Sequence, residues 1–451
     1  MSEHTMTNTA ADAASPRRAT KKHDLAAVVG LFVLAVAVAA LFWAVLPAEY
    51  RQNQSTDYSG SYEPVARAIL AGRGITDDSG APATRYPPGF SLLLAGTWAV
   101  GGALGLADDT ALLLFRLLCA GLSVVLLYGL ARLVWPVVGA ALVGVAWATY
   151  PFFLWITKQP NSEVPFIPVF FGALLLFWLA VLRRPRVWWL YLLAGGLAGA
   201  AMLIRPAALG LGVVMAALVL LLARPVRWPG RLGLAALLLL GNALAVAPWL
   251  GGVYAATGEI IPLSSGGTVT FKDGLTFLVA EKEYRRDVPV AADVAALLGE
   301  FERRRPEMAS TGDVVTVVLD EARQAPGAFL RFTLIKAARS WYGIDSRTFE
   351  GPTLALQAVY LLLVLGGNAA VFLFRRPLGI AHLADLRRML AGNWLIVGYF
   401  WAMTMAVVPL LRYMLPLMGP LFIALPAVYY ALRSRLVGRV GNPPLRRSTT
   451  N

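Results

Sequence analysis

Long apolar runs separated by short polar segments dominate the pattern of this chain. An α-helix needs about 20 apolar residues to cross the roughly 30 Å hydrocarbon core of a bilayer. Ten runs approach or exceed that length, and they predict membrane spans at 25–47, 111–134, 137–157, 163–182, 188–204, 207–223, 232–253, 352–374, 391–410 and 413–432. The pattern therefore predicts an all-α polytopic membrane protein.

The run 88–106 is shorter and has five glycines after Pro88. If this run does not cross, six segments share one side: the N-terminal tail, the Arg132 turn, 183–186, 224–231, 375–388 and the tail after Arg433. They carry half of the 40 lysines and arginines but only four of the 26 acids. Because basic loops stay in the cytoplasm, both termini are predicted there. The run 88–106 is then a re-entrant or interfacial helix, and a short true span is the alternative.

The same reasoning divides the chain into five parts. We predict a disordered cytoplasmic tail at 1–24, a transmembrane catalytic module at 25–253 with an outer loop at 48–110, an outer-face loop at 254–350, C-terminal transmembrane helices at 351–435 and a basic cytoplasmic tail at 436–451. Helical spacing of apolar residues within 294–335 predicts short amphipathic helices on the outer membrane face.

Composition excludes several classes of protein. Charged residues make up 15% of the chain, against roughly 25% in soluble domains. The net charge of +14 is explained by the basic cytoplasmic turns, so it predicts no nucleic-acid partner. Cys119 is the one cysteine, and the histidines, His4, His23 and His382, are all predicted to be cytoplasmic. An outer zinc site with histidine ligands is therefore excluded, whereas a carboxylate-held Mg²⁺ or Mn²⁺ stays open with its ligands unknown.

Two acids in the predicted outer segments are candidate catalytic residues. Asp57 lies about ten residues past the first span, where a carboxylate can act as a general base or help hold a metal; its alternative role is to cap the helix that follows. Glu163 begins the 163–182 span, where an acid at the edge of hydrocarbon marks a possible site. Its alternative role is that of a helix-start acid favoured by the helix dipole.

Basic residues are the candidates for binding a phosphate group. Arg205 and Arg412 lie in short outer turns that otherwise lack basic residues, and arginine binds phosphate in a bidentate manner. Snorkelling, or pairing with a structural acid, is the alternative. Lys158 lies close enough in sequence to Glu163 to pair with it or with a phosphate, and Arg85 precedes a Tyr-Pro-Pro turn.

The chain resembles the bacterial GT-C glycosyltransferases, of the kind similar to protein O-mannosyltransferases and lipid A aminoarabinose transferases (glycosyltransferase family 39-like). The likeness covers about 25–435 and rests on DYSGSYEPVARAILAGRG, RYPPGF, NSEVPF, GGLAGAAMLIRPAAL, APWLGGVYAATGEIIPLSSGG, APGAFLRFTLIKAARSW and LLRYMLPLMGPL, in that order. It implies a GT-C-like bundle of about 10–11 transmembrane helices with interfacial helices in its outer loops.

The resemblance also implies an activity. A polyprenyl-phosphate-linked sugar would be the donor, used on the extracytoplasmic face of the bacterial inner membrane, and the acceptor would be a glycan, a lipid or a protein. Asp57 matches the catalytic acid and Glu163 the second acidic position. Arg205 and Arg412 match basic positions near the donor phosphate, and an inverting attack by the acceptor hydroxyl is expected.

The remaining expectations concern substrate contacts and departures from the family. We assign Tyr62, Tyr86 and Tyr413 to the substrate-facing loops. Family members commonly have an Arg-Asn pair after Pro-Trp, whereas this chain has Leu250-Gly251 there. Two other functions remain as alternatives: a flippase or transporter for lipid-linked sugars, and a non-catalytic subunit of an envelope glycan assembly. The absence of sequence repeats and of mid-membrane charges, Arg116 apart, speaks against transport.

Overall fold

The computed structural model describes residues 16–52, 56–224, 226–276, 290–344, 349–373 and 382–440. The outermost parts of both predicted tails, 1–15 and 441–451, therefore lie outside the described residues. The elements are α1 (Pro16–Val45), α2 (Ala48–Gln52), η1 (Tyr58–Tyr62), α3 (Glu63–Leu70), α4 (Gly89–Ala103), α5 (Asp108–Arg132), α6 (Val137–Ala148), α7 (Pro151–Thr157), α8 (Glu163–Arg183), α9 (Trp188–Ile204), η2 (Pro206–Ala208), α10 (Leu211–Leu222), α11 (Trp228–Thr257), α12 (Gly267–Thr276), α13 (Ala292–Arg303), η3 (Arg305–Glu307), α14 (Thr311–Gln324), α15 (Pro326–Arg339), α16 (Glu350–Leu373), α17 (Leu383–Ala406), α18 (Leu411–Phe422) and α19 (Leu425–Val440).

The all-α polytopic fold is confirmed. Within the described residues, seven helices are long and apolar enough to cross a membrane, and α18 and α19 together make one of them. The predicted span 137–157 is a bent pair, α6 and α7, with an angle of 53° between them. The predicted spans 188–204 and 207–223 are shorter apolar helices. Because Pro151 cannot donate the backbone hydrogen bond that a continuous helix needs, the break falls between α6 and α7.

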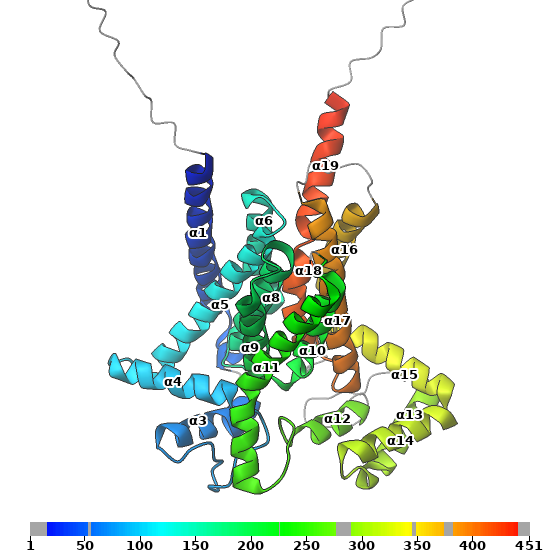
Figure 1. Cartoon of the computed structure of the whole chain (residues 1–451). Helices are drawn as coiled ribbons and strands as arrows, with labels where there is room; N and C mark the ends of the chain where they lie inside the picture. Colours follow the sequence, from blue (N-terminus) through cyan, green and yellow to red (C-terminus); the bar gives the residue numbers. More distant parts are fainter. Residues whose placement is uncertain are drawn as a thin grey trace, which may run out of the picture.

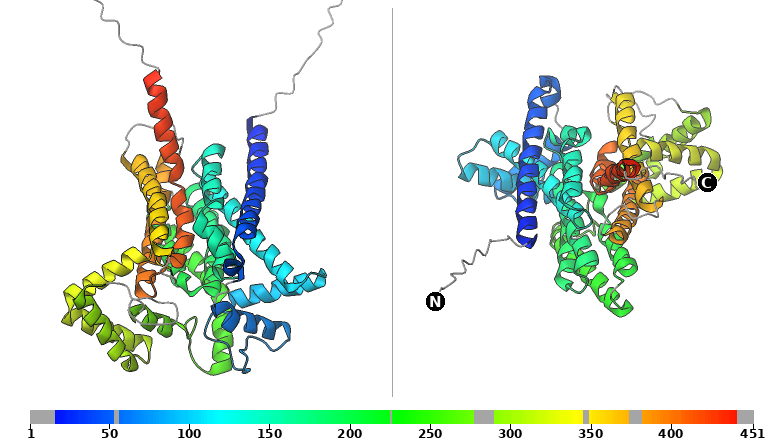
Figure 2. Two further views of the ribbon diagram at one scale, coloured as in Figure 1. Left: turned by 180° about the vertical axis from the view of Figure 1, so that it is seen from behind. Right: turned by 90° about the horizontal axis from the view of Figure 1, so that it is seen from above.

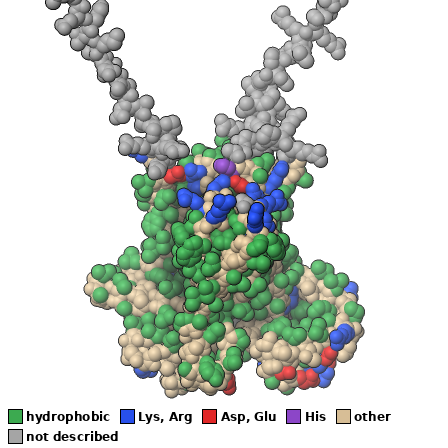
Figure 3. Space-filling view, viewed as in Figure 1, with side chains coloured by type: hydrophobic (Ala, Val, Ile, Leu, Met, Phe, Trp, Pro, Cys, Tyr) green, Lys and Arg blue, Asp and Glu red, His purple; other side chains and the backbone are tan. Residues whose placement is uncertain are grey.

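The two ends of the bundle differ in composition. In Figures 1 and 2, the first residues of α1 and the last residues of α19 lie at the same end, and α3 and α12–α15 lie at the other. Figure 3 shows a broad apolar band between them, with lysine and arginine side chains gathered at the end that carries the termini. Two ion pairs lie at that end, Arg132 with Asp24 and Arg183 with Asp385. This arrangement agrees with the predicted placement of the termini on one side.

The end of the bundle opposite the termini carries short helices that do not run along the bundle axis. Helix α4 lies across the bundle end in both side views (Figures 1 and 2), as the interfacial interpretation of 88–106 requires. Helices α12–α15, with η3, have an apolar core of their own at this end, and we call them the outer module after the side on which the sequence predicts them. Ser310 and Asp313 begin α14 with a reciprocal capping box, and Pro326 opens α15. These caps separate the short helices that apolar spacing predicted.

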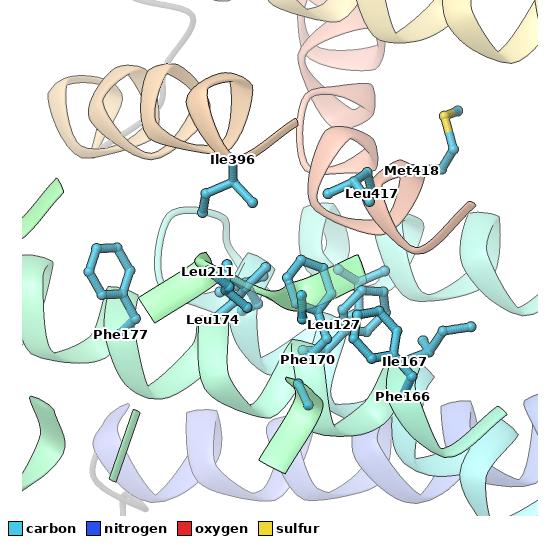
Figure 4. Close-up of a cluster of buried hydrophobic side chains, with 14 of the residues drawn as sticks. Leu127, Phe166, Ile167, Phe170, Leu174, Phe177, Leu211, Ile396, Leu417 and Met418 are labelled. Atoms are coloured by element: carbon cyan, nitrogen blue, oxygen red, sulfur yellow. The ribbon is translucent and has the colours of Figure 1, made fainter. Parts of the chain in front are cut away.

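The core of the bundle lies around α8. Figure 4 shows Phe166, Phe170 and Phe177 of α8 among buried side chains from α5, α10, α17 and α18. Helices α9 and α11 approach so closely that a Cβ at Gly195 would overlap the carbonyl oxygen of Leu238. Small residues permit such close backbone packing in membranes, where the lipid supplies no hydrophobic drive between helices. The tight α8–α9–α11 arrangement fixes the end of α9, where Arg205 begins the turn to η2.

Candidate functional site

Asp57 precedes an irregular turn in the segment between α2 and α4. Residues Tyr58–Tyr62 form a π-helical turn, a rare conformation that is frequent at functional sites. The backbone of Asp57 is helical (φ −65°, ψ −36°), and its side chain makes no capping hydrogen bond, so the capping alternative does not apply. Its Oδ1 instead accepts a hydrogen bond of 2.9 Å from the hydroxyl of Tyr86. The carboxylate thus points at the outer-loop aromatics rather than at its own helix.

Tyr86 and Tyr62 form an aromatic wall beside Asp57. Their rings stack with centroids 4.9 Å apart, and the Ser91 hydroxyl donates to the backbone oxygen of Tyr62 at 3.0 Å. Burial, reinforced by the Asp57 charge, raises the pKa of Tyr86 to about 12. Burial also raises the pKa of Tyr62. Both phenols therefore keep their protons at neutral pH, and Tyr86 stays a hydrogen-bond donor to Asp57.

Glu163 and Arg205 form a buried ion pair. Nη1 of Arg205 lies 2.6 Å from Oε2 of Glu163 and donates to the Ser162 hydroxyl at 2.8 Å. Glu163 is 2% exposed and Arg205 7% exposed. The sequence left open whether Arg205 pairs with an acid. The structure shows that its Nη1 does so with Glu163. Glu163 begins α8, as the helix-start interpretation expects, and it also faces the cluster.

Arg412 joins the two acids. Its Nη2 lies 3.6 Å from Oδ2 of Asp57, and its Nε lies 3.7 Å from Oε1 of Glu163. The ring of Tyr413 lies near both guanidinium groups, 5.3 Å from that of Arg205 and 5.2 Å from that of Arg412. Two carboxylates, two guanidiniums and three tyrosines thus meet at one end of the bundle, from segments about 355 residues apart in the sequence. We call this group the charge cluster.

Backbone contacts hold the cluster from two directions. A Cβ at Gly89 would lie 2.5 Å from the carbonyl oxygen of Leu203, so the start of α4 rests directly on the end of α9 beside Arg205. On the other side, the backbone nitrogen of Leu411 donates to the carbonyl of Gly343 at 2.8 Å. Leu410, in the segment before α18, is buried in the apolar core of the outer module. The outer module therefore fixes the first turn of α18 and with it Arg412.

Lys158 and Arg85 take other positions. The ammonium of Lys158 donates to the backbone oxygen of Tyr50 and lies 4.3 Å from the ring centre of Trp155. The guanidinium of Arg85 lies 5.6 Å from the ring of Tyr86, and its backbone oxygen accepts from Gly266 at 3.2 Å. Lys158 is thus placed apart from the two acids, whereas Arg85 borders the aromatic wall. Their expected role in phosphate binding stays a prediction.

A cavity of about 370 Å³ opens within the first outer loop. Its lining includes Tyr62, Arg85, Tyr86 and Ser91, together with Ser265 from the turn after α11. Ser265 donates from its backbone nitrogen to the oxygen of Thr84 at 2.8 Å, which closes the cavity against the following loop. Because Tyr86 lines this cavity and also contacts Asp57, the cavity borders the charge cluster.

The donor set fits a divalent cation poorly. Across the part of the chain that the structure describes, no group of three or more histidine, cysteine, aspartate or glutamate side chains is placed to hold one. Both acids of the cluster face guanidinium groups within 4 Å, so their charge is already balanced. A Mg²⁺ or Mn²⁺ ion prefers several oxygen ligands that keep their negative charge.

Two partners were not singled out as site residues from the sequence. Ser162 directly precedes α8 but makes no side-chain cap; its hydroxyl accepts a hydrogen bond from the guanidinium of Arg205 at 2.8 Å. The backbone oxygen of Gly343, which follows α15, accepts the hydrogen bond that holds Leu411. The sequence Asn-Ser-Glu could have indicated the role of Ser162. Its hydroxyl lies next to the acid Glu163 in the chain and can therefore bind the same guanidinium. Gly343 had no such signal, since its partner lies 68 residues away.

A family profile matches part of the sequence. Residues 85–251 match the family described as dolichyl-phosphate-mannose-protein mannosyltransferase. This range includes Glu163 and Arg205 but neither Asp57 nor Arg412, which the fold brings to them. No curated protein matches the sequence.

The fold is similar to solved structures of the oligosaccharyltransferase of Archaeoglobus fulgidus. The apo form has a TM-score of 0.55 and 14% identity, covering 92% of this chain and 51% of that one. A form tethered to an acceptor peptide has a TM-score of 0.53 and 15% identity, covering 92% and 50%. A complex with an inhibitory peptide and a dolichol-phosphate has a TM-score of 0.50 and 16% identity, covering 94% and 52%. This chain thus spans about half the length of the structures that it matches.

Proposed function

We propose that this membrane protein is a glycosyltransferase of the GT-C type, which moves a sugar from a polyprenyl-phosphate donor to an acceptor hydroxyl. The reaction takes place on the extracytoplasmic face of a bacterial inner membrane. The observation that carries the proposal is the charge cluster, in which Asp57, Glu163, Arg205 and Arg412 meet where the segment before η1 joins the start of α8, the end of α9 and the start of α18. The family match and the dolichol-phosphate bound by a protein of similar fold support a lipid-linked donor.

Asp57 is the proposed general base. Its Oδ2 takes the proton of the acceptor hydroxyl while the acceptor oxygen bonds to the anomeric carbon. The bond from that carbon to the phosphate oxygen breaks, and its electron pair leaves with the lipid phosphate, so the configuration inverts. The Tyr86 hydroxyl orients Asp57 by donating to its other oxygen at 2.9 Å. Base assistance of this kind typically contributes roughly 10²–10⁴-fold to the rate.

Arg412 is the proposed contact for the departing phosphate. Its side chain is 28% exposed, whereas that of Arg205 is 8% exposed, so Arg412 is the more accessible cation to a lipid headgroup. A fixed guanidinium stabilises the negative charge that grows on the leaving oxygen without reorganisation during the reaction. Arg205 contributes by holding Glu163 and by adding positive charge beside it. The cavity bordered by Tyr86 is the proposed entry for the acceptor.

The Asp57→Asn variant tests the proposal. Asparagine keeps the shape of the side chain and can accept the Tyr86 hydrogen bond, but it is not a base. Transfer of radiolabelled sugar from a polyprenyl phosphate should fall by about 10²-fold or more, with the melting temperature unchanged. Asp293→Asn, on the exposed surface of the outer module, is the matched control and should keep full activity.

The same assay separates the alternatives. A flippase would move the labelled lipid across vesicles without transferring its sugar, and a non-catalytic subunit would do neither. Full transfer by the Asp57→Asn variant would remove Asp57 from the role of base.

A further inference from the structure

Arg412 occupies an unusual place in the charge cluster. Arg412 presents two different nitrogens to two acids that come from distant segments of the chain. Nη2 faces Asp57 at 3.6 Å and Nε faces Glu163 at 3.7 Å. Asp57 lies in the first outer loop and Glu163 at the start of α8. Arg412 therefore bridges the two acids, as a metal ion would bridge them in a two-carboxylate site.

The oxygens on which a metal would depend are already faced by cations. Oε2 of Glu163 is taken by Arg205 at 2.6 Å. Oε1 of Glu163 is buried without a hydrogen-bond partner among the described residues, and it is the atom that Nε of Arg412 faces. Divalent cations bind carboxylate oxygens at about 2.0–2.6 Å. An ion placed there would have to share this oxygen with a guanidinium and repel it at close range.

The net charge of the cluster also disfavours the binding of a divalent metal ion. Asp57 and Glu163 contribute two negative charges, and Arg205 and Arg412 contribute two positive charges, so the cluster is neutral without a metal. A divalent ion would add two uncompensated positive charges beside the buried pair, which is costly where solvent is largely excluded. Tyr62 and Tyr86 cannot compensate for that charge at neutral pH, because burial raises the pKa of both phenols.

We propose that Arg412 takes the place of the divalent cation in this site. Its guanidinium holds the two carboxylates apart from each other and supplies the positive charge next to the reacting groups, so the site binds no divalent metal. The statement on binding stands on the cluster alone. The consequence that transfer needs no metal rests on the function proposed above.

Mn²⁺ binding to the full-length protein in detergent tests the proposal without any substrate. Electron paramagnetic resonance should detect no Mn²⁺ site in the wild-type protein that depends on Asp57. Arg412→Ala leaves two acids with one cation and should bind Mn²⁺ at least tenfold more tightly than the wild type. Adding Asp57→Asn to Arg412→Ala should abolish that gain. Arg331→Ala removes an exposed guanidinium from a surface acid and should bind Mn²⁺ as the wild type does.

Two results would overturn the proposal. One is a Mn²⁺ site in the wild-type protein that Asp57→Asn removes. The other is an Arg412→Ala variant that binds Mn²⁺ no better than the wild type, since the guanidinium would then not occupy the place of the ion. A folding check by size-exclusion chromatography ensures that the variants compared are intact.

A transfer assay tests the consequence. After treatment with EDTA, the wild-type protein should transfer sugar within twofold of the untreated rate, and added Mg²⁺ or Mn²⁺ should not raise it. A tenfold loss restored by either ion would contradict metal-independent transfer. A protein with no transfer under any condition would refute the proposed function but not the proposal on Arg412, because Mn²⁺ binding is measured without donor or acceptor.

Discussion

Arg205→Met should destabilise the protein far more than a typical arginine substitution. The side chains of Arg205 and Glu163 are 8% and 3% exposed and lie 2.6 Å apart, so methionine leaves a buried carboxylate without its closest partner. Breaking a buried ion pair typically costs about 3–5 kcal/mol. Arg412 still faces Glu163 at 3.7 Å and offsets part of the loss. We therefore expect a loss of about 3 kcal/mol in the free energy of unfolding.

The measurement is a double-mutant cycle in mixed detergent micelles, with unfolding driven by SDS. Glu163→Leu alone leaves the buried Arg205 without its acidic partner. The double variant Arg205→Met/Glu163→Leu removes both charges. The double variant should recover about 2 kcal/mol relative to the sum of the single losses, because contacting residues couple by roughly 0.5–3 kcal/mol. Arg331→Met is the matched control. Its pair with Asp293 is 59% and 38% exposed, and such surface pairs contribute at most about 1 kcal/mol.

Equal losses for Arg205→Met and Arg331→Met would refute the reasoning, because burial is the only reason for the expected difference. Additive losses in the cycle would show that the two charged side chains do not stabilise each other. Either result would also weaken the assignment of Arg205 as the residue that holds Glu163 in the charge cluster.

Three further predictions follow from the contacts of the outer loops. A Cβ at Gly343 would lie 2.7 Å from a backbone carbonyl oxygen of the segment before α18, so Gly343→Ala should displace Arg412 and lower kcat for transfer about tenfold or more; Gly299→Ala, with open space around it, should not. Burial lowers the pKa of Lys336 from 10.5 to about 7. Between these pH values the unfolded chain binds one more proton than the folded protein, so the free energy of unfolding rises with pH. Lys336→Met should flatten that rise in unfolding measurements from pH 7 to 10. Tyr86→Phe removes the hydrogen bond to Asp57 but keeps the ring stack, and transfer should fall roughly tenfold without loss of thermal stability.

The membrane-spanning helices could be predicted from the sequence because the bilayer imposes their length. Backbone groups in hydrocarbon must form their hydrogen bonds within the helix, so each crossing leaves a long apolar run. The side on which the short turns lie was predicted from basic residues alone. That reasoning also grouped Asp57, Glu163, Arg205 and Arg412 at one surface, where the structure brings them together.

Helix ends and details that depend on distant contacts could not be predicted. Helix α1 begins at Pro16, ahead of the expected boundary at 25, because polar residues with good helix propensity can extend a helix beyond its apolar part. The π-helical turn at Tyr58–Tyr62 has no periodic signature. The bridging position of Arg412 depends on three segments folding to one place, and no spacing within any one of them indicates which nitrogen faces which acid.

The shared interior of the outer module and the segment before α18 has a consequence for protein engineering. Val408 and Leu410 belong to the same apolar cluster as Phe301 and Phe332, although 76 to 109 residues separate them in the chain. A chimaera that exchanges only 254–350 with a homologue would combine, in one apolar core, side chains that come from two different proteins. A stable graft therefore has to include 407–411 together with the loop, since these residues connect the outer module to the first turn of α18.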